Sequence, residues 1–292
     1  MDLIKGFENI VSENEPLAPW TRMRIGGVAE FFAEPTSVEQ LAELVVRFRD
    51  ADLPVRLLGG GSNLLVRDEG TAGLVINLSA PAFCKLDVSD DTVRVGGGTR
   101  LSHLVSLGVG QGFSGLENLV GIPGTVGGAL HGNSGNQHAA IGTWTRSATV
   151  LTRKGELVTR DTGDINFGYR QSSLTELVIV EATLKFETEE VDQLTRRMQK
   201  LWIVKRSSQP ASDQDAGYVF HDVGGEPAGR LIEQAGLRGT RIGSVEISSG
   251  DANFFVTSPG ATSDDVLRLI ELVQTQVNER LGIELKQSLA VW

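Results

Sequence analysis

The stretch Val55-Arg-Leu-Leu-Gly-Gly-Gly-Ser-Asn-Leu-Leu-Val66 places three consecutive glycines and a Ser-Asn pair between two apolar runs. The apolar runs predict two short strands, and glycine accepts backbone angles that a side chain forbids. Several N–H groups can therefore turn toward one small volume, which is the geometry of an anion nest. Ser62 and Asn63 add polar side chains at its rim. The stretch predicts a phosphate or diphosphate site; a glycine-rich hairpin without a ligand is the alternative.

This loop differs from two common phosphate-binding loops. No Gly-Lys-Ser/Thr triplet follows the glycines, so it is not a nucleoside-triphosphate loop. Residues 64–66 are expected to form a strand where the helix of a Rossmann fingerprint would begin.

A second glycine-rich stretch, Gly121-Ile-Pro-Gly-Thr-Val-Gly-Gly-Ala129, is expected to be another loop. Pro123 restricts its local geometry and Thr125 supplies a hydroxyl. Glycines leave room for a ligand to approach the backbone. Two such loops favour a long diphosphate ligand held at several points.

Composition narrows the functional class. The chain has 292 residues, of which 40% are hydrophobic, and its net charge is -10. That charge argues against nucleic acid and anionic membranes as partners. The single Cys84 excludes a disulfide and a thiolate metal site, and His103, His131, His138 and His221 lack metal-ligand spacing, so we expect no metal. Without a signal-like start or a membrane-length apolar run, the chain is expected to be soluble and cytoplasmic.

The sequence predicts an α+β protein in two parts. Strand Val28–Ala33, a helix capped by Ser37 with Gln40 as its partner, and the strand from Val55 form a βαβ unit. Short alternating strands then predict a largely antiparallel sheet up to residue 188. We therefore expect a first domain over 1–188, with subdomains of about 1–78 and 79–188, and a smaller domain over 189–292.

The second part carries its own pattern. A stripe at helical spacing, from Val191 to Trp202, predicts a core-facing helix, and a helix capped at Thr262 or Ser263 should end at Gly282. The segment from Ile283 to Val291 is expected to be a last strand. Five cations suggest an anion site or a solvated face: Lys205, Arg206, Arg230, Arg238 and Arg241.

Tyr169 and Arg170 lie between two predicted strands. An arginine can hold a carboxylate through two parallel hydrogen bonds, and a tyrosine hydroxyl can contact a diphosphate. An ordinary exposed turn is the alternative.

Together these motifs resemble the UDP-N-acetylenolpyruvoylglucosamine reductase (MurB) family from about Thr21 onward. The resemblance rests on both glycine stretches, on Tyr169-Arg-Gln-Ser172, on Ala228-Gly-Arg-Leu-Ile-Glu-Gln-Ala-Gly-Leu237 and on Arg241-Ile-Gly243. It implies an FAD-binding domain of the PCMH type (vanillyl-alcohol-oxidase-like) with two subdomains, followed by a smaller α+β substrate-binding domain. The implied reaction reduces the enolpyruvyl UDP-sugar to UDP-N-acetylmuramate for peptidoglycan, with non-covalent FAD and NADPH as hydride donor.

The resemblance also implies roles for individual residues. Arg170 matches the catalytic arginine of the family, while Tyr169, Ser172 and Arg230 are expected to bind substrate, and a monomer is favoured. The expected FAD-binding residues lie in the two glycine stretches: Leu58, Gly59, Gly60, Gly61, Ser62, Asn63, Gly121, Ile122, Pro123, Gly124, Thr125, Gly127 and Gly128.

Two catalytic positions depart from the family pattern. Where the family has a proton-donating serine in Ser-Ala-Gly-Ser-x-Phe, this chain reads Asp215-Ala-Gly-Tyr-Val-Phe220 and places Tyr218 there. Where the family has a glutamate near the C-terminus, this chain has Ser288. A phenol can donate a proton, so the leading hypothesis is an active reductase with Tyr218 as replacement acid. The alternatives are a catalytically degenerate flavin-binding protein with a regulatory role and a flavin oxidoreductase with a different substrate.

Overall fold

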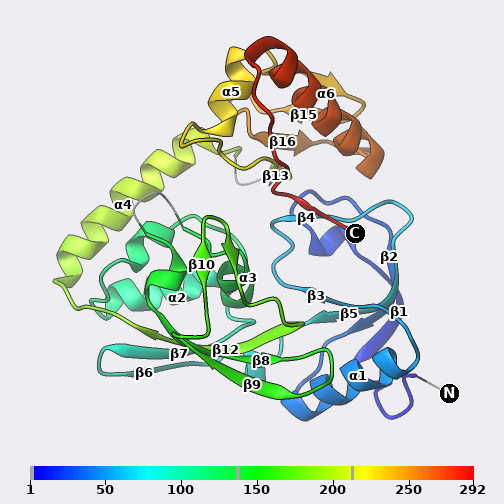
Figure 1. The fold of residues 1–292 in the computed structure, drawn as a ribbon, viewed down its shortest axis with the longest axis vertical. Coiled ribbons are helices and arrows are strands. Elements are labelled where there is room, and N and C mark those ends of the chain that lie inside the picture. The colour runs from blue at the N-terminus through cyan, green and yellow to red at the C-terminus, as the bar shows by residue number, and fades with distance from the viewer. Residues whose placement is uncertain (1–2, 136–138, 212–213) are drawn as a thin grey trace. The chain divides into compact units, whose positions relative to one another are not determined.

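The computed structural model describes residues 3–135, 139–211 and 214–292, so His138 lies outside the described part. The chain divides into two compact units (Figure 1). Unit 1 comprises Met1–Asn14, Phe31–Gly60 and Ala72–Ile203, and unit 2 comprises Glu15–Glu30, Gly61–Thr71 and Val204–Trp292. The units therefore interleave along the chain, and the predicted domain boundary at residue 188 stays a prediction.

The first sheet, most of which belongs to unit 1, has the strand order β1-β2-β5-β3. Its strands are β1 (Val11–Pro16), β2 (Val28–Ala33), β3 (Val55–Leu58) and β5 (Thr71–Asn77), and β3 pairs parallel with β5. Helix α1 (Val38–Asp50) connects β2 to β3, in the chain order of the predicted βαβ unit. Ser37 caps α1 as expected, whereas the Gln40 side chain accepts from the amide of Thr36.

The second sheet of unit 1 is antiparallel throughout, with the order β6-β7-β12-β8-β9. Helices α2 (Leu101–Gly110) and α3 (Val126–His131) share its hydrophobic core (Figure 1). Its strands are β6 (Leu86–Ser89), β7 (Thr92–Gly96), β8 (Thr145–Leu151), β9 (Leu157–Asp161) and β12 (Val178–Lys185). A separate hairpin consists of β10 (Phe167–Gly168) and β11 (Gln171–Ser172).

The second glycine stretch is only partly a loop. Residues 121–125 are irregular, but α3 begins at Val126 because the Thr125 side chain accepts a hydrogen bond from the Gly128 amide and caps the helix. The expectation of a loop through Ala129 was therefore wrong in its second half. Short 3-10 helices occur at η1 (Ala18–Trp20), η2 (Pro81–Phe83), η3 (Leu116–Leu119) and η4 (Ile141–Thr143).

Helix α4 (Val191–Ser208) forms as predicted, but most of its apolar stripe is not buried in a core. Of the predicted core-facing stripe only Leu194 is buried, and Met198 packs at the edge of the unit 1 core. Val191 is 41% exposed and Trp202 is 44% exposed. Helical spacing predicts which side chains share a face; whether a neighbour covers that face depends on packing.

Unit 2 has its own core, formed by a four-stranded sheet and helices α5 (Ala228–Gln234) and α6 (Ser263–Leu281). Thr262 caps α6, and Gly282 ends it in the left-handed conformation, as predicted. The strand order is β13-β16-β15-β14. The strands are β13 (Ala216–Tyr218), β14 (Arg241–Ile242), β15 (Val245–Ile247) and β16 (Phe254–Thr257).

The predicted last strand is shorter than expected. Only β17 (Ala290–Val291) forms, and it pairs parallel with β4 (Leu64–Leu65), the strand directly after the first glycine stretch. The preceding residues form single contacts instead, such as the bridge between Phe220 and Gln287. An apolar pattern indicates extended chain, but a strand also needs a partner along its full length.

No helix in the described part of the chain is long and apolar enough to cross a membrane.

Candidate functional site

The two glycine stretches meet inside unit 1. A Cβ added to Gly60 would lie 2.7 Å from the Cα of Gly124, and one added to Gly59 would lie 2.8 Å from the Thr125 hydroxyl. Both separations are shorter than a side chain tolerates, so glycine is required for the loops to approach. The two stretches, which are far apart in the chain, thus form one surface.

Four backbone amides on this surface donate to no residue in the described part of the chain. The N–H groups of Gly59, Gly60, Gly124 and Thr125 donate no hydrogen bond to any described residue. Both Gly60 and Gly121 are exposed. Because unbonded amides attract anions, this cluster has the chemistry of a diphosphate site.

Other amides of the second stretch are used within the fold. Val126 donates to the Thr99 carbonyl at 2.9 Å, Gly127 donates to the Gly97 carbonyl at 2.8 Å, and Ile122 donates to the Leu119 carbonyl at 3.1 Å. The Gly128 amide caps α3 through the Thr125 hydroxyl at 3.3 Å. These residues therefore shape the loop, and a ligand contact from them would have to use other atoms.

The first stretch continues into unit 2. Gly61 has φ +58°, which side chains rarely allow. A Cβ there would also overlap the Trp20 carbonyl oxygen, so glycine is required at this turn. Its carbonyl accepts from the Arg22 amide at 3.0 Å. Arg22, which the sequence analysis did not identify, is therefore a half-buried cation beside this loop. Burial lowers the pKa of its guanidinium.

Helix α3 connects the second glycine stretch to the Tyr169–Arg170 hairpin within unit 1. The Ser172 hydroxyl donates to the His131 carbonyl at 2.9 Å, and the Asn133 side chain donates to the Gly168 carbonyl at 2.8 Å. The hairpin is therefore tied to the C-terminal end of the helix that Thr125 caps. Ser172 has a structural role in this tie; its predicted contact with substrate stays a prediction.

Tyr169 and Arg170 form the tip of the β10–β11 hairpin. Tyr169 is 61% exposed, and the Arg170 guanidinium carbon lies 5.9 Å from the centre of the Tyr169 ring. Arg170 has φ +56°, which is uncommon for a residue with a side chain. The strained turn leaves Tyr169 exposed and Arg170 half-buried at the tip of the hairpin.

In unit 2, Tyr218 lies at the end of β13. Its hydroxyl donates to Asp222 Oδ1 at 3.3 Å, and its ring meets Phe254 edge to face at 5.3 Å. Asp222 is a partner of the predicted site residue Tyr218 that sequence reasoning missed. Its position four residues after Tyr218 is the only signal in the sequence, and that spacing alone does not predict a contact.

Ser288 lies beside the same segment of unit 2. Its amide donates to the Val219 carbonyl at 2.7 Å, next to Tyr218 in the chain. Its carbonyl accepts from the Asn63 side chain at 2.9 Å. The structure thus brings together three predicted site positions, Asn63, Tyr218 and Ser288, within unit 2.

Three of the five cations predicted in unit 2 face carboxylates. Arg230 pairs with Glu226 at 3.3 Å, and Arg238 pairs with Glu233 at 2.9 Å. Arg241 pairs with Glu246. These exposed ion pairs are compatible with the solvated face, and both the anion site and a substrate contact of Arg230 stay predictions.

The described residues contain no group of three or more His, Cys, Asp or Glu side chains that could hold a metal ion.

The facing glycine loops and their unbonded amides suit a ligand that carries a diphosphate, and the comparisons identify that ligand as a flavin dinucleotide. Residues 29–161 match the FAD binding domain family, and residues 209–292 match the C-terminal domain of UDP-N-acetylenolpyruvoylglucosamine reductase. The fold and the site therefore define an FAD-dependent oxidoreductase with two domains.

Relatives along the whole chain identify the family. The UDP-N-acetylenolpyruvoylglucosamine reductase of Rhodopirellula baltica is 38% identical over 97% of this chain and 93% of its own length. That of Anoxybacillus flavithermus is 37% identical over 99% and 97%. The crystal structure of the enzyme (MurB) from Thermus caldophilus has a TM-score of 0.80 at 33% identity, over 97% of this chain and 98% of that chain. The chain belongs to the UDP-N-acetylenolpyruvoylglucosamine reductase family, as its motifs predicted.

Proposed function

We propose that this protein reduces UDP-N-acetylenolpyruvoylglucosamine to UDP-N-acetylmuramate, a step of peptidoglycan precursor synthesis, with FAD as cofactor and NADPH as hydride donor. Family membership over nearly the whole chain supports the reaction. The observation that carries the cofactor is the set of unbonded amides on the facing loops, at Gly59, Gly60, Gly124 and Thr125. A cytoplasmic monomer belongs to the same proposal.

The residues present fit the cofactor. Four amides and two close glycine contacts make a surface on which a diphosphate can lie against the backbone. The predicted binding set, residues 58–63 with 121–125, 127 and 128, includes this surface. Bound FAD supplies the hydride for the enolpyruvyl double bond after taking it from NADPH.

Arg170 is proposed to bind the substrate carboxylate. It lies at the tip of a short hairpin that is anchored by His131, at the end of α3, and by Asn133, just after the helix. A guanidinium holds a carboxylate through two parallel hydrogen bonds and so fixes its orientation. Tyr169, at the same tip, is proposed to contact the substrate as well.

Tyr218 is proposed to deliver the proton. Reduction of the double bond needs one hydride and one proton, and the proton must reach the carbon adjacent to the carboxylate. The Tyr218 phenol is a proton donor, and Asp222 holds its hydroxyl at 3.3 Å. Ser288, where the family has a glutamate, supplies no charge; its backbone links Asn63 and Val219 instead.

The test mixes the purified protein with NADPH and the enolpyruvyl UDP-sugar under anaerobic conditions. We expect the flavin to be bleached by NADPH and then reoxidised by the UDP-sugar, with UDP-N-acetylmuramate as product. A yellow protein that the UDP-sugar never reoxidises would contradict the proposal and favour the two alternatives, a degenerate relative or a different substrate.

A further inference from the structure

A buried carboxylate lies at the entrance to the second glycine stretch. Glu117 is 4% exposed and belongs to η3, which ends two residues before Gly121. Burying a carboxylate is unfavourable unless hydrogen bonds or opposite charges compensate for lost hydration. The partners of Glu117 therefore indicate what the carboxylate does.

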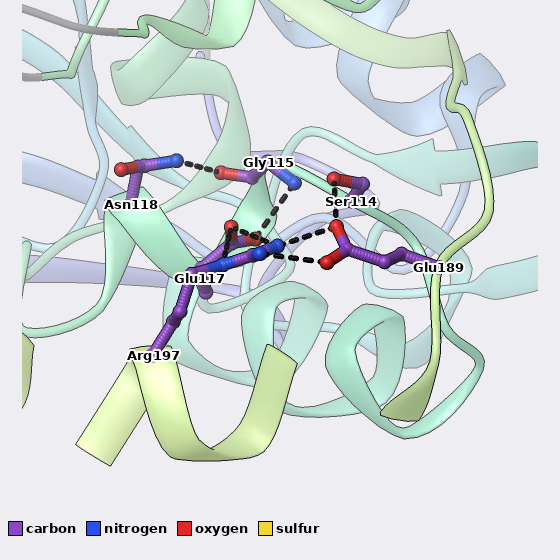
Figure 2. A network of polar contacts seen from close by, with 6 residues as sticks. All are labelled: Ser114, Gly115, Glu117, Asn118, Glu189 and Arg197. Atoms are coloured by element: carbon purple, nitrogen blue, oxygen red, sulfur yellow. Dashed lines mark hydrogen bonds and ion pairs between the residues drawn. The ribbon is translucent and has the colours of Figure 1, made fainter. Parts of the chain in front are cut away.

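Figure 2 shows these partners. The Glu117 carboxylate accepts from the Gly115 amide at 2.7 Å and from Arg197 Nε at 3.2 Å. Arg197, on α4, also donates to both carboxylate oxygens of Glu189, at 2.7 Å and 2.6 Å. Ser114 completes the network by donating to Glu189 at 3.0 Å.

The network stabilises a turn that has little freedom. Gly115 has φ +103°, and a Cβ there would lie 2.2 Å from the Trp144 ring, so only glycine fits. The Gly115 amide lies directly before η3 and donates its hydrogen bond to the Glu117 carboxylate rather than to a backbone carbonyl. The Asn118 side chain in turn donates to the Gly115 carbonyl at 3.0 Å. Glu117 and Asn118 thus bind both backbone polar groups of Gly115, the residue directly before η3.

The orientation of η3 is passed on to the loop. The Val120 amide donates to the Glu117 carbonyl at 3.3 Å, and the Ile122 amide donates to the Leu119 carbonyl at 3.1 Å. The other end of the loop is held separately, since the Leu101 amide donates to the Gly124 carbonyl at 3.0 Å. Two main-chain hydrogen bonds therefore join η3 to the start of the loop, and one joins α2 to its end.

We propose that Glu117 is a positioning residue for the FAD-binding loop at Gly121–Thr125, and that Arg197 of α4 holds Glu117 in place. This inference rests on the loop assigned to the diphosphate under the proposed function; it does not depend on the proton donor. A loop that is already ordered before the diphosphate arrives binds it more tightly than a loop that has to be ordered during binding. A residue that holds the loop in place should therefore raise FAD affinity.

The experiment measures FAD affinity of the full-length protein after its flavin has been removed. Titration with FAD, followed by flavin fluorescence and the visible spectrum, gives the dissociation constant. Arg197→Met is expected to raise it about tenfold, a typical size for coupling through a side-chain network. Arg197→Lys keeps the charge and is expected to restore most of the affinity. Glu117→Gln, which preserves the shape and an acceptor for Gly115, replaces Arg197→Met if that variant does not fold.

Arg160→Met is the matched control. Arg160 pairs with Glu176 at 2.9 Å and is 40% exposed, against 43% for Arg197, but it contacts neither η3 nor the loop. It is expected to leave FAD affinity unchanged. If Arg197→Met lowers only the thermal stability of the flavin-free protein and leaves the dissociation constant unchanged, the network is structural and the inference is overturned.

A variant in α3, the helix that follows the loop, separates this inference from the proposed function. Gly128→Ala adds a methyl group to the first turn of this helix. If it weakens FAD binding while Arg197→Met does not, the positioning role alone fails. If Gly128→Ala has no effect while Arg197→Met weakens binding, FAD does not approach the backbone of α3, and the positioning role of Glu117 and Arg197 is supported.

Discussion

The hydroxyl of Tyr218 donates to Asp222 Oδ1, and the same oxygen accepts from the Ala228 amide at 3.0 Å, where α5 begins. Asp222 therefore joins the phenol to the first turn of a helix that is buried in the unit 2 core. The ring is also packed against Phe254. The phenol is thus held in one orientation, as a proton donor must be.

Tyr218→Phe tests the proton donor. The ring and its packing on Phe254 stay, and only the hydroxyl is removed. We expect reoxidation of the reduced flavin by the UDP-sugar to slow by ~10²–10⁴-fold, the usual contribution of general acid catalysis. Reduction by NADPH should not change, because that step needs no proton from Tyr218. Stopped-flow absorbance measures the two steps separately, and an unchanged reoxidation rate would exclude Tyr218 as the acid.

Restoring the two family residues provides a complementary test. Tyr218→Ser with Ser288→Glu recreates the serine and the glutamate of the family pattern. If the pocket is otherwise that of a reductase, the double variant should reoxidise its flavin at least ten times faster than Tyr218→Ser alone, since general acid–base groups are worth roughly 10²-fold or more. Equal rates for the two variants would show that position 288 does not take part.

Gly128→Ala should distinguish ligand contact from protein packing. A Cβ at Gly128 would meet only the Thr125 hydroxyl, at an ordinary 3.5 Å, so the flavin-free protein has room for it. Alanine in a helix should raise stability by up to about 1 kcal/mol. If FAD approaches this backbone, affinity for FAD falls while the melting temperature of the flavin-free protein holds or rises.

Gly163→Ala is the matched control, because a Cβ at Gly163 would meet no atom within 4 Å. FAD affinity of this control should equal that of the wild type. Equal affinity in Gly128→Ala would place the cofactor away from α3.

Asp251→Asn tests a pH dependence. Burial raises the pKa of the Asp251 carboxyl, and the charge of Asp222 raises it further, against a hydrogen bond from the Asn253 amide and the charge of Arg238. The folded protein therefore binds this proton more tightly than the unfolded chain does. Ionisation of Asp251 costs stability as pH rises from about 3.9, the unfolded value, through the folded pKa.

The asparagine side chain keeps an acceptor for the Asn253 amide, which Asp251 binds at 2.9 Å, and removes the charge. The melting temperature of Asp251→Asn minus that of the wild type should therefore be higher at pH 7 than at pH 4. Thermal melts at both pH values measure this, and a difference that is equal at both, or larger at pH 4, would contradict it.

Local chemistry made much of the fold predictable. The caps at Ser37 and Thr262 and the end of α6 at Gly282 depend only on neighbouring residues, and all three were confirmed. The α4 stripe failed because burial needs a covering surface, and the segment 283–289 failed because a strand needs a partner. Neither requirement is visible in residue spacing.

The sequence by itself determined the family, the flavin cofactor and the glycines of both loops, because backbone freedom and motif identity are properties of consecutive residues. Only the tertiary structure decided which amides remain for a ligand, since Gly127 and Gly128 donate inside the fold while Gly60 and Gly124 do not. It also decided that Asn63 contacts Ser288 across a separation of 225 residues. Such contacts follow from how a core closes, and that depends on the whole chain.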